Sequence, residues 1–304
     1  MKIAILGATG QIGRCLALAY SKPAIVTLFA RNIHAAQAFV QSYDLSAEVA
    51  GYDRLSDGDF DLIINALGNG VPGDIRRAGA SILDITAHYD RLCVDYLTRH
   101  PDCSYIFLST GAIYGAEYEQ ARKPNPVIKI PLGQTADGLY YPIAKRLAEL
   151  RHRDTPDLKI ADIRIFGFVS TQMDLTSDFL VAQILQATLT GTTFDTRRED
   201  VVRDYIGPDD LTGLIDQLVR HSTPNGAYDI LSAAPTSKFR ILEALANEHG
   251  LSYTIDGVCG SGLQAPLPGR LSNNLATERV GFSPKSTSLD NIIFMAENRA
   301  APQA

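Results

Sequence analysis

The sequence has few of the residues that disulfide scaffolds and metal sites require. Its 304 residues include four cysteines, which form no CxxC pair and no metal-like spacing. Scattered thiols of this kind are typical of a reduced cytosolic protein. The six histidines are also far apart in sequence, so we expect surface or capping residues rather than metal ligands. The cysteines are Cys15, Cys93, Cys103 and Cys259, and the histidines are His34, His88, His100, His152, His221 and His249.

The sequence also lacks an excess of positive charge and a long hydrophobic run. The formal net charge of -6 argues against a sequence-independent nucleic-acid binder, which needs a basic surface. No apolar run approaches the ~20 residues that a membrane span requires. Only residues 1–6 precede the first glycine, which is too short for a signal-peptide core. We therefore expect a cytoplasmic protein with neither a nucleic-acid partner nor a membrane partner.

What is present is the pattern of an α/β protein. Strands and helices alternate over residues 1–166, which predicts a doubly wound parallel sheet of the Rossmann type with ligands at the carboxyl ends of its strands. The expected strands cover 2–6, 25–30, 60–66, 81–85, 104–108 and 159–166, and the expected helices cover 10–20, 33–43, 89–99 and 141–152.

Beyond residue 166 the regular alternation of strands and helices ends. Glycine and proline separate short elements, with helices expected near 177–190, 209–221 and 238–249. We therefore predict two domains: a dinucleotide-binding Rossmann domain over 1–166, and a smaller α/β substrate-binding cap over 167–304. Some elements of the cap are expected to return to the first domain.

A glycine-rich turn joins the first strand to the first helix. Gly7 permits a tight turn, Gly10 leaves room for a pyrophosphate, and Gly13 lets the helix approach the strand. The free N–H groups and the positive dipole of the helix N-terminus then suit the phosphates. The predicted cofactor-binding residues of this turn are Gly7, Thr9, Gly10, Gln11, Ile12 and Gly13.

The second strand is expected to end beside the adenosine ribose. NAD-preferring proteins place a carboxylate there, but this sequence has Arg31, which can pair with a 2′-phosphate. Arg14 is a second candidate partner. The sequence therefore favours NADP(H), with NAD(H) as the alternative, in which Arg31 is a surface arginine. Asp53 is a candidate contact to the adenine amino group, and Leu67 and Gly68 complete the predicted cofactor-binding set.

A candidate catalytic set lies at the carboxyl edge of the predicted sheet. Thr110 follows the strand expected over 104–108, and Tyr141 and Lys145 lie four residues apart on a helix, so they share a face. The cation of Lys145 is expected to lower the phenol pKa from about 10. Tyr141 then exchanges a proton at a carbonyl or carbinol oxygen that Thr110 also binds, and Lys145 holds the nicotinamide ribose.

Together these motifs resemble the extended short-chain dehydrogenase/reductase family, in its NAD-dependent epimerase/dehydratase branch. The resemblance extends to residues 109–115, which are similar to SSxxVYG, and to 203–210, which are similar to RDYIHVxD. Residues 280–284 are similar to LGFxP. In nucleotide-sugar members an arginine at the position of Arg203 binds the substrate diphosphate, and Arg270 is the candidate for a second arginine. The resemblance also implies a homodimer formed through the helices near 88–99 and 141–153.

Departures from the family patterns narrow the expected reaction. Sugar 4,6-dehydratases carry Asp-Glu directly after the catalytic threonine, whereas this chain has Gly111-Ala112. Hydride transfer alone remains, and the leading hypothesis is an NADPH-dependent reductase of a nucleotide-linked 4-keto sugar. One alternative is an NAD-dependent nucleotide-sugar 4-epimerase. The others are a reductase of a non-nucleotide carbonyl compound and a catalytically silent NADP-sensing protein.

Overall fold

A single parallel sheet organises the molecule. The computed structural model describes residues 1–68, 70–115, 121, 123, 126–127, 137–256, 258–259, 271–272, 274 and 276–299. Seven strands pair in parallel in the order β3-β2-β1-β4-β5-β6-β9. The strands are β1 Lys2–Leu6, β2 Ile25–Phe29, β3 Ala47–Ala50, β4 Leu62–Asn65, β5 Ser104–Thr110, β6 Ile160–Ile165 and β9 Gly226–Ile230. The predicted Rossmann class of fold is confirmed.

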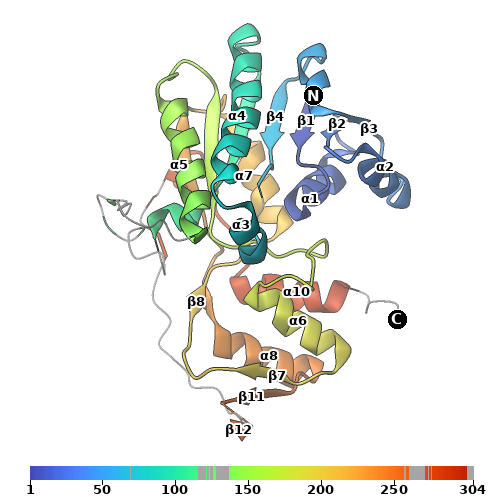
Figure 1. Cartoon of the computed structure of the whole chain (residues 1–304), viewed down its shortest axis with the longest axis vertical. Helices are drawn as coiled ribbons and strands as arrows, with labels where there is room; N and C mark the ends of the chain where they lie inside the picture. The colour runs from blue at the N-terminus through green and yellow to red at the C-terminus, as the bar shows by residue number, and fades with distance from the viewer. Residues whose placement is uncertain are drawn as a thin grey trace.

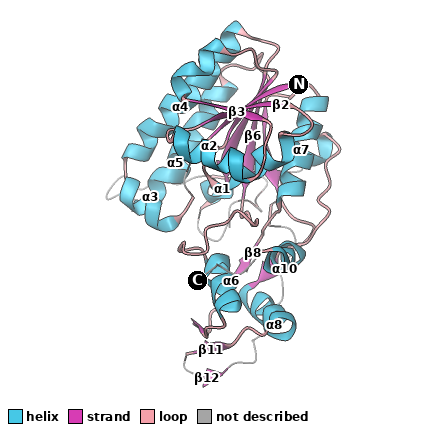
Figure 2. Cartoon of the chain, turned by 90° about the vertical axis from the view of Figure 1, so that its right-hand side faces the viewer, coloured by secondary structure: helices cyan, strands magenta, loops and turns pink. Residues whose placement is uncertain are grey.

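Helices cover both faces of this sheet, which is why its central strands are apolar on both sides. All residues of β4 and β5 are buried. Helices α4 and α5 lie on one side of the sheet and α7 lies on the other (Figures 1 and 2). The sheet-covering helices are α1 Gln11–Tyr20, α2 Ile33–Ser42, α4 Ser81–Arg99, α5 Tyr140–Arg153 and α7 Pro208–Arg220.

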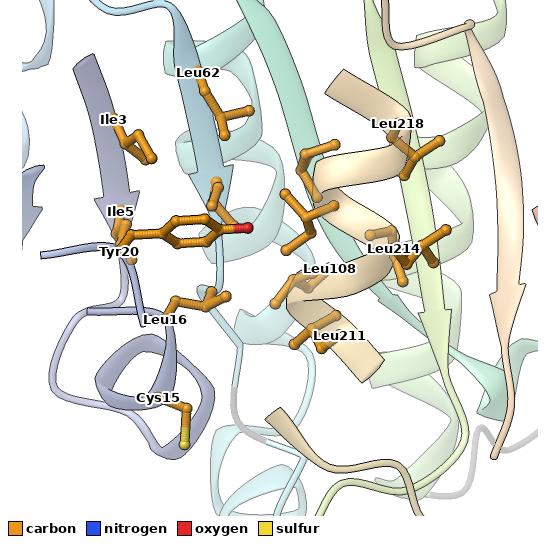
Figure 3. Packing of buried hydrophobic residues seen from close by; sticks show 14 of the residues in the cluster. Ile3, Ile5, Cys15, Leu16, Tyr20, Leu62, Leu108, Leu211, Leu214 and Leu218 are labelled. Atoms are coloured by element: carbon orange, nitrogen blue, oxygen red, sulfur yellow. The ribbon is translucent and has the colours of Figure 1, made fainter. Parts of the chain in front are cut away.

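The core on the α7 side of the sheet is formed by segments far apart in the sequence. Leu211, Leu214 and Leu218 lie at helical spacing on α7 and are completely buried. They belong to the same apolar cluster as Ile3 of β1 and Tyr20 of α1, and Figure 3 shows these side chains meeting. An element that follows residue 166 therefore completes the core of the N-terminal sheet.

The helices that form a second apolar cluster lie below the carboxyl edge of the sheet in Figure 1. This cluster packs helices α6, α8 and α10 together, with a three-stranded sheet in the order β12-β11-β7 beside them. The elements are α6 Leu180–Thr190, β7 Phe194–Thr196, α8 Lys238–His249, β11 Tyr253–Ile255, β12 Val258–Cys259 and α10 Ser288–Asn298. Since α7 and β9 pack with the first sheet, the division at residues 166 and 167 stays a prediction.

Smaller elements connect these layers. Helix α3 precedes α4, a short antiparallel pair joins β8 to β10, and 3-10 turns follow β3 and β5. They are η1 Tyr52–Asp57, α3 Pro72–Ala78, η2 Gly111–Tyr114, η4 Asp137–Leu139, β8 Val202–Arg203, β10 Thr236–Ser237 and α9 Ala276–Arg279. Among the described helices, none combines the length and the apolar character needed to cross a membrane.

One sequence-based expectation about the sheet is wrong, and the sequence analysis also missed its edge strand. The strand expected over 81–85 is instead the first turn of α4, where Ile82 is buried and Ile85 is about half exposed. The apolar residues of this segment therefore follow the helical period, which five residues are too few to reveal. The edge strand β3 was not expected, because its sequence Ala-Glu-Val-Ala is short and only partly buried.

Candidate active site

The turn between β1 and α1 requires its glycines for different reasons. Gly7 has a φ of +79°, and a Cβ there would lie 2.8 Å from the carbonyl oxygen of Ala66. A Cβ on Gly13 would lie 2.2 Å from the carbonyl oxygen of Gly7, so no side chain fits. A Cβ on Gly10 would lie 3.3 Å from that oxygen, its nearest neighbour, and no side chain caps α1 there. A Cβ at Gly10 would therefore be a tight fit but not an impossible one, and Gly10 lines the cleft described next. The uncapped N–H groups at this end of α1 suit a pyrophosphate.

A cleft of about 1170 Å³ opens at the carboxyl edge of the sheet. Its walls come from the glycine-rich turn, the ends of β4 and β5, the start of α5 and the segment after β6. Eleven of the residues predicted from sequence line it: Thr9, Gly10, Gln11, Ile12, Arg14, Leu67, Gly68, Thr110, Tyr141, Lys145 and Arg203. Four others, Gly7, Gly13, Arg31 and Asp53, lie outside its lining.

The three residues of the candidate catalytic set meet in this cleft. Thr110 ends β5, and its hydroxyl accepts a hydrogen bond from the N–H of Ala112 at 3.1 Å, which starts the η2 turn. A second hydrogen bond joins the Thr110 hydroxyl to the phenol of Tyr141, in the first turn of α5. Lys145 lies one turn further along, with its Nζ 6.0 Å from the centre of the Tyr141 ring. This arrangement can present a phenol and an alcohol to one substrate oxygen.

Burial, rather than the nearby cation, dominates the titration of Tyr141. Burial raises the pKa of this phenol to about 12, although the hydrogen bond from Thr110 lowers it. The expectation that Lys145 brings this pKa below its ordinary value is therefore wrong for this structure. The phenol is protonated at neutral pH, which is the state that donates a proton.

Lys145 is itself almost fully buried, with 1% of its surface exposed. Burial lowers the pKa of its ammonium to about 8, while Asp90, Asp162 and Glu149 oppose this shift. Its Nζ donates hydrogen bonds to the carbonyl oxygens of Leu67 at 2.9 Å and Leu108 at 2.8 Å. Lys145 therefore ties the ends of β4 and β5 to α5 at the floor of the cleft.

A buried ion pair that the sequence analysis did not identify lies behind the catalytic set. Glu149 accepts hydrogen bonds from the Ser109 hydroxyl at 2.7 Å and from Arg164 at 2.6 and 2.9 Å. Its four-residue spacing from Lys145 places both on one face of α5, and this spacing was the available signal. Ser109 precedes Thr110, so Glu149 fixes the end of β5 against α5.

The residues predicted for the adenosine lie at the end of β2 and in η1. Arg31 and Asp53 are both exposed. Tyr52, which the sequence analysis did not single out, contacts the Tyr89 ring at 4.6 Å between centres, and its hydroxyl bonds to the backbone of Gly7. The two rings are tilted by 56° to each other, and the hydrogen bond to Gly7 joins this pair to the glycine-rich turn.

The predicted substrate arginines differ in what the structure describes. Arg203 of β8 lines the cleft, and its guanidinium donates to the carbonyl oxygen of Val202 at 3.0 Å. Asp204 faces away into a network with Ser232, whose N–H and hydroxyl donate to it. Arg270 lies outside the described residues.

The described histidines and cysteines form no metal centre. No group of three or more His, Cys, Asp or Glu side chains in the described ranges could hold a metal ion. Cys15, Cys93 and Cys103 are buried free thiols. The expectation that every histidine is a surface or capping residue is wrong for His152, which is fully buried between Asp90 and Asp162.

Comparisons with known proteins place this geometry in context. Residues 3–231 match the model of the NAD dependent epimerase/dehydratase family. No curated protein sequence matches the chain.

Solved structures of similar fold cover nearly the whole chain. A UDP-glucose-4-epimerase from Stenotrophomonas maltophila with bound NAD and formylated UDP-arabinopyranose has a TM-score of 0.74 and 14% identity, covering 98% of this chain and 97% of that one. A UDP-glucose 4-epimerase from Bifidobacterium longum in complex with NAD+ and UDP has a TM-score of 0.70 and 14% identity, over 98% and 99%. A UDP-N-acetylglucosamine 4-epimerase from Bacillus cereus has a TM-score of 0.68 and 16% identity, over 98% of each chain.

Proposed function

The chain belongs to the NAD dependent epimerase/dehydratase family, and on that premise we propose that it transfers a hydride at a secondary alcohol or ketone of a nucleotide-linked sugar. The observation that carries this proposal is the meeting of Thr110, Tyr141 and Lys145 in one cleft with the open glycine-rich turn. A bound nicotinamide dinucleotide would accept or supply the hydride. The protein's residues would bind, orient and move the proton.

Each residue of the set has a distinct task in this chemistry. Thr110 and Tyr141 are hydrogen-bonded to each other and can both reach one substrate oxygen. Tyr141 transfers the proton to or from that oxygen, because it is the only one of the three whose proton lies on an acidic oxygen. Lys145 holds the carbonyl groups of Leu67 and Leu108 and keeps a positive charge beside the reacting oxygen.

The 4-epimerase reaction is the first candidate. The similar structures reported above are 4-epimerases of UDP-sugars. Gly111 and Ala112 offer no acid or base for eliminating water, so the residues after Thr110 suit hydride transfer without dehydration. In this reaction Tyr141 would remove and then return a proton while the substrate passes through a transient ketone. Arg203, with Arg270, would bind the diphosphate.

An NADPH-dependent 4-keto sugar reductase is the second candidate, and two arginines favour it. Arg31 lies two residues after the end of β2, where an acidic residue would favour NAD, and Arg14 lines the cleft.

The protein as purified distinguishes these candidates. An epimerase is expected to retain a bound cofactor, so that the purified protein shows the absorbance of nicotinamide or adenine, and to turn over a nucleotide sugar without added NADPH. A reductase is expected to purify without bound cofactor and to consume one NADPH for each substrate molecule that it reduces. For the reductase, Arg31→Ala should raise the KM for NADPH and leave that for NADH unchanged. A wild-type preference for NADH would contradict the NADP assignment.

Two variants test the proposal as a whole. Arg203→Ala should raise the KM for a nucleotide sugar, and unchanged turnover would instead indicate a non-nucleotide carbonyl substrate. Tyr141→Phe should abolish turnover.

If the wild-type protein binds a dinucleotide but converts neither a nucleotide sugar nor a ketone, it would be an NADP-sensing protein. A homodimer through α4 and α5 is part of the same proposal, and the mass of the protein in solution tests it.

A further inference from the structure

A charged cluster is buried beneath the candidate active site. His152 of α5 lies between two carboxylates, with its Nδ1 2.6 Å from Asp162 of β6 and its Nε2 2.7 Å from Asp90 of α4. All three side chains are at most 1% exposed. Because each ring nitrogen faces an accepting carboxylate oxygen, both nitrogens carry protons and the ring is an imidazolium. Arg151 and Arg153 bind the outer oxygens of Asp90 and Asp162 from the surface.

A chain of buried hydrogen bonds leads from this cluster toward the cleft. The Tyr105 hydroxyl donates to Asp90 Oδ1 at 3.1 Å and accepts from the Asn65 amide at 2.9 Å. The Asn65 carbonyl oxygen in turn accepts from the N–H of Leu67 at 3.0 Å. Tyr105 and Asn65 are at most 1% exposed, so water does not compete for these bonds.

The chain ends at residues that line the cleft. The Leu67 peptide is held at both ends, its N–H by Asn65 and its carbonyl oxygen by Lys145. A Cβ on the next residue, Gly68, would lie 3.1 Å from the Lys145 ammonium, so the turn is closely fitted to it. A second contact path runs through Phe107, whose ring lies 4.4 Å from that ammonium and 5.3 Å from the His152 ring.

We propose that His152, Asp90, Tyr105 and Asn65 are positioning residues that hold the Leu67–Gly68 turn and Lys145 in the geometry that binds a nicotinamide dinucleotide. This inference rests on the proposed function, because it concerns the same cleft. A buried charged cluster is a poor way to gain stability, since well-packed apolar residues serve as well. Its connection to Lys145 gives it a role that apolar packing does not supply.

The test removes one hydroxyl from the middle of the chain. Tyr105→Phe keeps the ring and leaves the pair of Asp90 and His152 intact, but it deprives Asn65 of its acceptor. Tyr20→Phe is the matched control, because the Tyr20 hydroxyl is also bound to a carboxylate, Asp216, at 2.9 Å. Asn65→Ala, which removes both of its bonds, serves as a second variant.

Two measurements follow these variants: titration with NADP and with NAD, and the NMR signal of the Lys145 ε-methylene group in cofactor-free protein labelled with ¹³C-lysine. The face of Phe107 shifts this signal, and Lys145→Arg identifies it. We expect Tyr105→Phe and Asn65→Ala to weaken dinucleotide binding about tenfold and to move the signal. Tyr20→Phe should change neither, with a similar loss of thermal stability.

The possible results separate this inference from the proposed function. Suppose that Tyr105→Phe loses thermal stability but binds the dinucleotide as tightly as Tyr20→Phe does, and that the Lys145 signal does not move. The cluster is then purely structural, and this result overturns the inference but not the proposed function. Wild-type protein that binds neither NADP nor NAD overturns the proposed function, and the inference with it.

Discussion

At the scale of single residues, the proposed reaction depends on the phenol of Tyr141. The sequence predicts that Thr110, Tyr141 and Lys145 meet. Thr110 lies at the end of a strand, and the four-residue spacing of Tyr141 and Lys145 puts them on one face of a helix, so their positions follow from local structure alone. The titration of Tyr141 could not be expected, since it depends on burial by elements distant in sequence. The same holds for Glu149 and His152, whose partners lie on other elements.

Tyr141→Phe is expected to lower kcat by about 100- to 10,000-fold, the usual contribution of a positioned proton donor. Dinucleotide affinity should change little, because the ring remains. Tyr140→Phe, which removes the hydroxyl of the neighbouring residue on α5, is the control and should leave kcat unchanged. Steady-state kinetics with the substrate identified as above provides the measurement. Equal rates for the two variants would contradict the assignment of Tyr141.

His152 makes the stability of the protein depend on pH. Burial alone would lower the pKa of this imidazole, but its hydrogen bonds to Asp162 and Asp90 outweigh burial and raise the pKa to about 9. A raised folded-state pKa contributes stability that is fully present below the unfolded value of about 6.5. This stability is lost as the pH rises through about 9.

We therefore expect the free energy of unfolding to fall by roughly 3 kcal/mol between pH 6 and pH 9.5 through this group. Urea unfolding at a series of pH values measures the change. The same series on Tyr20→Phe, which leaves the His152 cluster intact, should have the same slope. A His152 NMR titration with a midpoint near 6.5 would contradict the expectation.

At the scale of elements, different glycines of the turn between β1 and α1 serve folding and binding. Gly13 is required by the protein itself, because a Cβ there would lie 2.2 Å from the Gly7 carbonyl oxygen, whereas a Cβ at Gly10 would lie 3.3 Å from the same atom. The sequence motif predicts both positions, but it does not say which glycine serves which purpose. Elements without a motif were predicted less well, because segments such as 81–85 and 47–50 are too short to show their period.

Gly10→Ala is expected to bind a dinucleotide about tenfold more weakly, because its methyl group occupies the space for a phosphate oxygen. It should lose less stability than Gly13→Ala, because a Cβ at Gly10 would lie 3.3 Å from the Gly7 carbonyl oxygen, whereas a Cβ at Gly13 would lie 2.2 Å from it. Gly13→Ala is its counterpart and should lose about 3 kcal/mol of stability through the clash with Gly7. Thermal unfolding and dinucleotide titration of both variants measure these effects. Normal binding by a folded Gly10→Ala protein would place the phosphates elsewhere.

At the scale of the whole molecule, the order of segments along the chain differs from their order in space. The alternation of strands and helices predicts the parallel sheet and its ligand-binding edge. The sequence also predicts that some elements after residue 166 return to the first domain, but it does not identify α7 and β9 as those elements, because that depends on contacts between distant segments. Leu214 belongs to the core that these contacts create.

Leu214→Ala is therefore expected to lower the free energy of unfolding by about 3 kcal/mol, the usual effect of removing a fully buried leucine side chain. Leu150→Ala deletes the same atoms at a position of α5 that is 47% exposed, and it should change stability little. Chemical denaturation of both variants measures the difference. Equal effects would show that α7 does not stabilise the sheet.

The late arrival of β9 affects how the protein is made. The ribosome releases β6 well before it has synthesised β9, which pairs with β6 on the side away from β5. The β6 edge of the nascent sheet therefore stays open while the intervening segment is translated. An open strand edge readily pairs with another polypeptide. During this interval the newly synthesised chain is exposed to wrong pairing with other polypeptides through that edge.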